Sequence, residues 1–217
     1  MNLIKIVRMA DLYYVLATNK SEKLPENSNS LSIILKNIEN LDTYQARKKY
    51  AEKNLKHLSS GSSRIVYESP EGTIIKIAKN DKGIAQNEAE SNPQMKSDFL
   101  NKIIKHAKNF SWIETFYLDK ITEEDFKDMT KLKFSDFGDS ISYGLREVSK
   151  SSSKDKPKNF DEVCKSKIYK EMKRIGEKFK LMPGDIARIS SWGTKNNKPI
   201  LIDAGLTKDI FDKFYED

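Results

Sequence analysis

The chain has very little cysteine and histidine. Among its 217 residues there is one cysteine, Cys164, and there are two histidines, His57 and His106, far apart in the sequence. A single cysteine excludes both an internal disulfide framework and a cysteine-based zinc site, and it is typical of a reducing compartment. We therefore expect no zinc site, and we interpret both histidines as ordinary surface or packing residues.

Long apolar runs are also missing. No stretch approaches the ~18 continuous apolar residues of a membrane span. Within the first twenty residues the apolar positions are interrupted by Lys5, Arg8 and Asp11, and no small-residue cleavage site follows. The sequence predicts neither a signal peptide nor an anchor. We expect a cytoplasmic protein that does not bind a membrane.

Charged residues, in contrast, are abundant. They make up 33% of the chain against 37% hydrophobic residues, which is typical of a soluble globular protein with one domain or two small lobes. The 39 basic and 32 acidic side chains give a formal charge of +7. This surplus favours anionic partners such as nucleotides, nucleic acids or acidic proteins, without choosing among them.

Residues 1–60 have the pattern of helices. Apolar residues in 31–41 repeat at helical spacing. Asp42 followed by Gln45 then predicts a capping box that opens a second helix, with Leu58 on its inward side.

Residues 61–122 predict a small antiparallel sheet with one helix, at 82–90. Short β-rich runs are separated here by turn signals, as in hairpins. The expected strands, in two pairs, are Arg64–Tyr67 with Thr73–Ala78 and Ile103–His106 with Trp112–Leu118.

Residues 123–217 predict a mostly helical second lobe. Its most regular feature is an amphipathic pattern over 163–182. The other expected elements are a helical stretch over 123–148 interrupted at Gly138 and Gly144, a mobile loop at Lys150–Lys158, a strand at Pro199–Ile202 and a closing segment at Leu206–Tyr215. This order predicts an α+β protein with its site in the cleft between two lobes.

A small-residue turn precedes a lysine in the predicted sheet. The turn contains Gly61, Ser62 and Ser63, and such turns let backbone N–H groups approach a phosphate. In the strand that follows, Lys76 shares one face with Ile74 and Ala78, because side chains alternate. A lysine on a small apolar surface can meet a phosphate. An acid on the next helix, Glu90 or Glu88, could pair with that lysine.

Two aspartates in the last third of the chain could converge on one site. Asp185 follows a Pro-Gly turn, and Asp203 leaves a strongly apolar strand. Aspartate is seldom buried unpaired, so a purely structural role explains Asp203 poorly. One carboxylate could face a substrate hydroxyl and the other a hydrated Mg²⁺, which prefers carboxylate and phosphate oxygens.

Taken in order, these segments resemble the protein-kinase-like fold, particularly its small members such as aminoglycoside phosphotransferases and related small-molecule kinases. The sequence looks most like compact kinase-like proteins encoded by bacteriophages. The resemblance implies a minimal bilobal fold with an antiparallel-sheet N-lobe, a truncated helical C-lobe and an extra N-terminal helical segment. The implied boundaries are 1–60 for the N-terminal helices, 61–122 for the N-lobe and 123–217 for the reduced C-lobe.

The resemblance also implies roles for individual residues. In the N-lobe, Gly61, Ser62 and Ser63 match the glycine-rich loop, Lys76 matches the lysine at the α- and β-phosphates, and Glu90 (or Glu88) its acidic partner. Glu114, within Trp112-Ile-Glu-Thr115, would lie in the hinge beside the adenine. In the C-lobe, Asp185 would accept the hydroxyl proton, Asp203 would bind Mg²⁺, and Ser190, where the family has asparagine, would be a weak second metal ligand. Apart from the resemblance, Arg188 lies three residues after Asp185 and could partly replace a lost cation by meeting the γ-phosphate.

The implied function is binding of ATP with Mg²⁺ and transfer of the γ-phosphoryl group to a hydroxyl. A small molecule, a nucleic-acid end and the protein itself all remain open as acceptors. The alternative is a pseudokinase that binds nucleotide, or only a host or phage protein, without catalysis. It is favoured by Ser190, where the family has asparagine, and by a truncated C-lobe with only 12 residues after Gly205. The retention of Lys76, Asp185 and Asp203 opposes it. If a phage encodes the protein, it acts in the host cytoplasm.

A nucleic-acid-binding module is a third interpretation. Basic and aromatic residues alternate near the predicted sheet, as in stacking platforms. Inward-facing aromatic residues of strands are more often core residues, so this interpretation is not favoured. The residues concerned are Lys105, Lys108, Phe110, Trp112 and Tyr117.

Overall fold

A computed structural model describes residues 30–149 and 155–215. The chain divides into two compact units, 1–30 and 31–217, and the following description concerns the second. The helices expected in 1–29 and the first part of the loop expected at Lys150–Lys158 lie outside the described residues. Within the described ranges, every helix is too short or too polar to cross a membrane.

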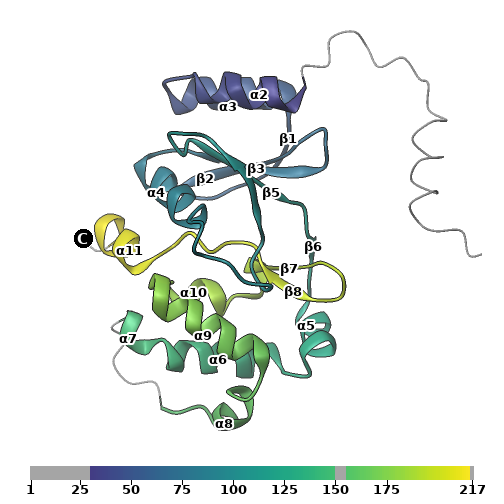
Figure 1. The fold of residues 1–217 in the computed structure, drawn as a ribbon, viewed down its shortest axis with the longest axis vertical. Helices are drawn as coiled ribbons and strands as arrows, with labels where there is room; N and C mark the ends of the chain where they lie inside the picture. The colour runs from purple at the N-terminus through teal and green to yellow at the C-terminus, as the bar shows by residue number, and fades with distance from the viewer. Residues whose placement is uncertain (1–29, 150–154, 216–217) are drawn as a thin grey trace, which may run out of the picture. The chain divides into compact units, whose positions relative to one another are not determined.

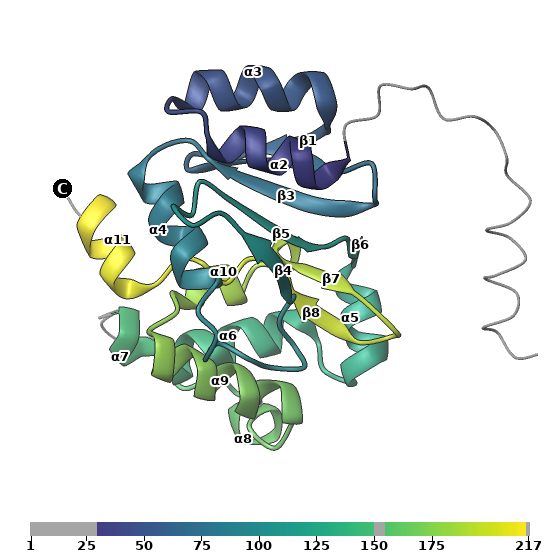
Figure 2. The same cartoon turned by 45° about the horizontal axis from the view of Figure 1, so that its top comes forward.

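The first lobe is a five-stranded antiparallel sheet with two helices on one face (Figures 1 and 2). The strands follow the order β1-β2-β3-β5-β4. The elements are α2 (Leu31–Glu39), α3 (Tyr44–Asn54), β1 (Lys56–Ser60), β2 (Arg64–Glu68), β3 (Thr73–Ala78), β4 (Ile103–His106) and β5 (Trp112–Phe116).

Alternation along the strands separates the two faces of this sheet. Ile65 pairs with Ile77, and Tyr67 with Ile75, and all four side chains lie in one hydrophobic core with α2 and α3. Because neighbouring residues point to opposite faces, Arg64 and Lys76 lie on the other side of the sheet. The alternation thus leaves two cations on the face that is not covered by α2 and α3.

Helix α4 (Asp81–Glu90) packs beside β3 and closely against the β1–β2 turn. Its N-terminus is capped by Asn80, whose side-chain oxygen accepts a hydrogen bond from the backbone N–H of Gly83 at 3.1 Å. A Cβ on Gly83 would lie 2.2 Å from the carbonyl oxygen of Ser63. The helix can therefore approach the turn only because residue 83 has no side chain.

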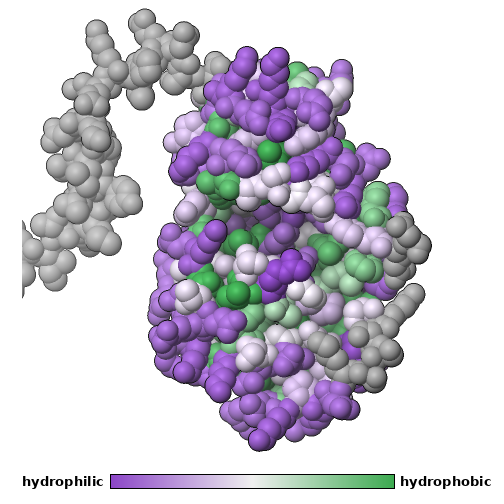
Figure 3. All heavy atoms as spheres, turned by 180° about the vertical axis from the view of Figure 1, so that it is seen from behind, coloured by the Kyte–Doolittle hydropathy of each residue, from purple (hydrophilic) through white to green (hydrophobic). Residues whose placement is uncertain are grey.

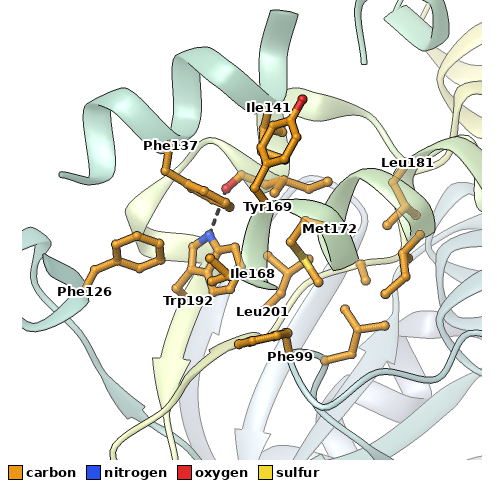
Figure 4. Close-up of a cluster of buried hydrophobic side chains, with 14 of the residues drawn as sticks. Phe99, Phe126, Phe137, Ile141, Ile168, Tyr169, Met172, Leu181, Trp192 and Leu201 are labelled. Carbon is orange, nitrogen blue, oxygen red and sulfur yellow. Dashed lines mark hydrogen bonds between the residues drawn. The ribbon is translucent and has the colours of Figure 1, made fainter. Parts of the chain in front are cut away.

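The second lobe is mostly helical and has its own hydrophobic core. Figure 4 shows the Trp192 ring beside Phe126 and Phe137, with centroids 5.7 Å from each. The indole N–H of Trp192 donates to the carbonyl oxygen of Ile186 at 2.8 Å. The elements are α5 (Glu123–Thr130), α6 (Phe134–Gly144), α7 (Arg146–Ser149), α8 (Phe160–Val163), α9 (Lys167–Phe179), α10 (Pro183–Ile186), a 3-10 turn (Ile189–Ser191), α11 (Lys208–Phe214) and the sheet β6 (Asp119–Lys120), β7 (Trp192–Thr194), β8 (Pro199–Leu201).

The surface of the protein reflects the high content of charged residues in the sequence. Figure 3 shows hydrophilic side chains over most of one face, with hydrophobic residues gathered at mid-height, below the level of α2 and α3 in Figure 1.

The predicted fold class is confirmed: an α+β protein with an antiparallel-sheet lobe and a mostly helical lobe. Both predicted hairpins form, as β2–β3 and β4–β5. The polypeptide passes from the first sheet to the second lobe through β6, and the segment that follows β8 contacts the first lobe at Lys76.

Some local predictions were wrong. The second helix is capped by Thr43 rather than Asp42, and it ends at Asn54. Leu58 is 39% exposed, because the chain pairs there with β2 as strand β1 instead of continuing as a helix.

Two further predictions about the second lobe need correction. Gly138 does not interrupt α6 but lies inside it, with the end of α10 against it at Ala187. The amphipathic helix predicted over 163–182 is shorter, because Ser166 caps α9 by accepting from the N–H of Tyr169 and the helix ends at Phe179.

The contact at Gly83 gives a stability prediction. Gly83→Ala should lower the free energy of unfolding by about 1–3 kcal/mol, because the new methyl group must push α4 away from Ser63. Gly184→Ala is the matched control, since a Cβ at Gly184 has nothing within 4 Å. Urea unfolding of the three proteins checks the prediction, which is wrong if both variants are as stable as the wild type.

Candidate functional site

The junction of the two lobes contains a network of four charged side chains. Lys76 Nζ lies 2.5 Å from Glu90 Oε1, and Arg64 Nη1 lies 2.5 Å from Glu90 Oε2. Arg64 Nη2 also pairs with Asp203 Oδ1. The side chains of Arg64, Lys76 and Glu90 are all more than nine-tenths buried. Glu90 therefore joins two cations in a place that water barely reaches.

Three elements of the first lobe supply this network. Arg64 begins β2, Lys76 lies in β3, and Glu90 ends α4. Of the two acids predicted to pair with Lys76, Glu90 makes the ion pair, whereas Glu88 is exposed. The spacing on the helix explains the difference: Gln86 and Glu90 share a face four residues apart, and both are buried.

The end of β8 brings the second lobe to the same place. Lys76 Nζ donates to the carbonyl oxygen of Ile202 at 2.6 Å, and Asp203 is the next residue. A Cβ on Gly205 would lie 2.7 Å from the carbonyl oxygen of Gln86, so only glycine lets this segment pass so close to α4. The structure thus brings together Lys76 and Asp203, which are far apart in the sequence.

Arg64 is the member of the network that the sequence analysis did not single out. A signal was present, because Arg64 pairs with Ala78 across β2 and β3 and therefore shares the face of Lys76. Asn87 supports it from α4: its side-chain oxygen accepts from Arg64 Nη1 at 3.3 Å, and its side-chain nitrogen donates to the carbonyl oxygen of Phe110 at 2.8 Å.

The turn predicted to approach phosphate is a tight one. The N–H of Gly61 donates to the carbonyl oxygen of Arg64 at 2.8 Å, and the buried Ser63 hydroxyl donates to Gln86 Oε1 at 2.6 Å. Lys79 Nζ donates to the carbonyl oxygen of Gly61 at 2.5 Å. Ser62 is exposed at the tip. The loop is therefore held in place by its flanks, and Gly61 is exposed together with Ser62.

Asp185 lies in α10 near this network. Burial raises its pKa to about 6, and the negative charge of Asp203 adds to the increase, against the opposing charges of Arg188 and Arg64. Arg188 Nη1 is 4.0 Å from Asp185 Oδ1 and is largely exposed. Ser190, in the 3-10 turn, is exposed as well.

The two aspartates have opposite environments. Burial alone would raise the pKa of Asp203, but the charges of Arg64 and Lys76 and hydrogen bonds from Arg64 and the backbone of Gly205 bring this pKa below its usual range. Asp203 therefore stays ionised, whereas Asp185 exchanges a proton near neutral pH. Such a division is what acid–base chemistry at a shared site requires.

Glu114 is not brought to the network. It lies within β5 opposite Ile75, which places its side chain on the face covered by α2 and α3, away from Lys76. It is 3% exposed and accepts a hydrogen bond from the Thr73 hydroxyl at 2.8 Å. The sequence resemblance predicts a hinge position for Glu114, whereas in the structure Glu114 lies inside strand β5.

In their observed positions, the predicted magnesium ligands are not arranged to bind a metal ion. Asp203 Oδ1 is already paired with Arg64, and Ser190 offers only an exposed hydroxyl. Within residues 30–149 and 155–215, no group of three or more histidine, cysteine or acidic side chains could hold a metal. The cation that neutralises Asp203 is the guanidinium group of Arg64.

Two open hollows lie elsewhere, over the second lobe. One, of about 600 Å³, is formed by α9, and the other, of about 440 Å³, lies between α9 and α11. Neither is lined by a predicted site residue. The candidate site is therefore defined by its charged contacts. The first hollow is lined by Tyr169, Lys170, Lys173, Arg174, Glu177 and Lys178.

Comparison with known proteins gives only distant likenesses. No protein-family model matches the chain, and no curated protein matches it. Solved structures that match include the streptomycin–ATP complex of APH(2")-IIa, with 14% identity, 79% of this chain and 74% of that chain covered, and a TM-score of 0.35. ADP-bound aminoglycoside phosphotransferase APH(2'')-Ib has 15% identity, coverage of 78% and 74%, and a TM-score of 0.37. With such TM-scores, these likenesses add nothing to the site, which rests on the contacts described above.

Glu90 offers a direct test of the network. Glu90→Gln should lower the free energy of unfolding by about 3–5 kcal/mol, because two buried cations lose their shared anion. The matched control is Glu88→Gln on the same helix, where an exposed acid should change stability by less than about 0.5 kcal/mol. Urea unfolding measures both, and equal small effects would contradict the network.

The pKa of Asp185 predicts a pH-dependent stability. Because its folded-state pKa lies near 6, above the unfolded value, the folded protein binds the proton more tightly. Ionisation of Asp185 should therefore lower the free energy of unfolding of the wild type by about 2–3 kcal/mol as the pH rises from about 4 to about 6. Unfolding of wild type and Asp185→Asn across this range checks it, and a stability difference that does not change with pH would refute the assignment.

Proposed function

We propose that the protein binds a nucleoside triphosphate at the junction of the two lobes and transfers its γ-phosphoryl group to a hydroxyl. The observation that carries this proposal is the buried Lys76–Glu90 ion pair next to two aspartates of opposite pKa shift. A lysine fixed in this way acts as a positioned cation for phosphate oxygens. Phosphoryl transfer depends mainly on positioning and charge, which this arrangement can supply.

In the proposed reaction, the acceptor hydroxyl oxygen attacks the γ-phosphorus, and the bond from that phosphorus to the β–γ bridging oxygen breaks. The nucleoside diphosphate leaves with the electron pair. The hydroxyl proton passes to Asp185, whose pKa near 6 suits a proton acceptor at neutral pH. Arg188 is exposed beside Asp185 and would place positive charge near the transferred group.

The remaining assignments follow from the sequence resemblance. Gly61, Ser62 and Ser63 would cover the phosphates, and the first two of these residues are exposed. The acceptor is a small molecule, a nucleic-acid end or the protein itself. A phage origin and a host or phage protein partner also remain predictions from the resemblance.

A second candidate is nucleotide binding without transfer. The pairing of Asp203 with Arg64 favours it, because this carboxylate is then engaged with a cation of the protein itself. The exposed Ser190 also supplies a weaker ligand than an amide or a carboxylate. In this case the bound nucleotide would stabilise a surface that contacts another protein.

Binding and transfer can be separated with two variants. ATP binding is measured by calorimetry, and transfer by labelled ATP in a cell lysate. Lys76→Met should weaken ATP binding at least about tenfold, because a phosphate loses its cation while Glu90 keeps Arg64. Asp185→Asn should keep its ATP affinity and lose about 10²–10⁴-fold in transfer rate.

The control variants replace exposed residues of the same charge, Lys56→Met and Asp161→Asn. Equal transfer by wild type and Asp185→Asn would remove Asp185 from the mechanism. Binding without transfer in the wild type would establish the second candidate. Failure of the wild type to bind any nucleoside triphosphate would contradict both.

A further inference from the structure

We infer that Arg64 takes the place of a divalent metal ion at Asp203, so that the site holds nucleotide phosphates without a metal. The inference rests on the proposed binding of a nucleotide at this junction, and it holds for either candidate function. It concerns a positioning residue that the sequence motifs did not reveal.

The contacts of Arg64 place its charge between two carboxylates. Nη1 lies 2.5 Å from Glu90 Oε2, and Nη2 pairs with Asp203 Oδ1. A metal ion that bound Asp203 to screen phosphate charge would need this same carboxylate. Planar guanidinium groups also bind phosphate oxygens well, so Arg64 can pair with Asp203 and bind a phosphate of the nucleotide at the same time.

The charge balance of the network shows that Asp203 is neutralised without a metal ion. Lys76, Glu90 and Asp203 together carry one net negative charge, which an added cation would neutralise. Arg64 supplies that cation and brings the network to zero. A divalent ion would add two positive charges beside the cationic groups of Arg64 and Lys76, and their repulsion opposes its binding.

Arg64 is also difficult to displace. Its side chain is 7% exposed and that of Glu90 is 5% exposed. Moving the guanidinium aside would separate buried opposite charges and break the hydrogen bond to Asn87. A metal ion that entered would have to offset this cost in addition to losing part of its own hydration shell.

The position of Arg64 in the chain suits contact with phosphate. It follows Ser63 directly, and its carbonyl oxygen accepts the N–H of Gly61, which closes the small-residue turn. The turn that is proposed to cover the phosphates and the cation at Asp203 thus belong to one short segment. Lys76, on the same face of the sheet, provides the second cation.

The test measures ATP binding to the full chain by calorimetry, in millimolar MgCl₂ and in EDTA. For the wild type, the two dissociation constants should agree within about threefold. Arg64→Gln should lose at least about tenfold in affinity in EDTA and regain affinity when MgCl₂ is added, because Asp203 is then free for the metal. Arg64→Lys should stay closer to the wild type, since it keeps the charge.

Lys56→Gln is the matched control, because Lys56 is a cation of the same sheet that pairs with an acid at the exposed surface. Circular dichroism verifies that each variant is folded. If Arg64→Gln fails to fold, the comparison of wild-type ATP binding in MgCl₂ and in EDTA tests the inference by itself.

The possible failures are distinguishable. Wild-type binding that tightens at least about tenfold with MgCl₂ would overturn the inference and leave the proposed function intact. Absence of binding in both buffers would overturn the proposed function, and the inference with it. Titration with Mn²⁺ alone gives a second readout, in which Arg64→Gln should bind the ion more tightly than the wild type, and equal binding would contradict the inference.

Discussion

The arrangement of strands and helix in the first lobe depends on one carboxylate, that of Glu90. Each of its oxygens faces a different cation, Lys76 or Arg64, and all three side chains are buried. A buried charge is tolerated only when it is paired, so removing Glu90 leaves Lys76 without its carboxylate partner. Strands β2 and β3 and helix α4 are thereby held in a fixed relation.

The same two cations also reach the second lobe. Lys76 donates to the carbonyl oxygen of Ile202, and Arg64 pairs with Asp203. Each lobe has its own hydrophobic core, so the junction between them is where polar groups can be concentrated. Burial raises the pKa of Asp185, and the negative charge of Asp203 adds to the increase. The network that joins the lobes therefore also contributes to the chemistry of the site.

Much of the fold could be predicted from local patterns. Alternation identified β2 and β3 and the common face of Lys76 and Ala78, and these strands pair as expected. Strand β1 could not be found in this way, because its pairing with β2 outweighs a helical spacing that continues to Leu58.

The site was predictable in part. The order of the motifs indicated that Lys76, an acid of the next helix, and Asp203 belong together, and the structure brings Lys76, Glu90 and Asp203 into one network. The role of Arg64 depends on a partner 139 positions away, which no local pattern encodes. Glu114 was assigned by motif alone, although its register opposite Ile75 sets it on the other face.

A crystal structure with a non-hydrolysable ATP analogue, grown in the presence of MgCl₂, tests the central claim most directly. The account predicts that the phosphates contact Lys76 and Arg64, with Arg64 still paired to Asp203. A nucleotide bound elsewhere on the chain, or a metal ion on Asp203 with Arg64 turned away, would contradict it.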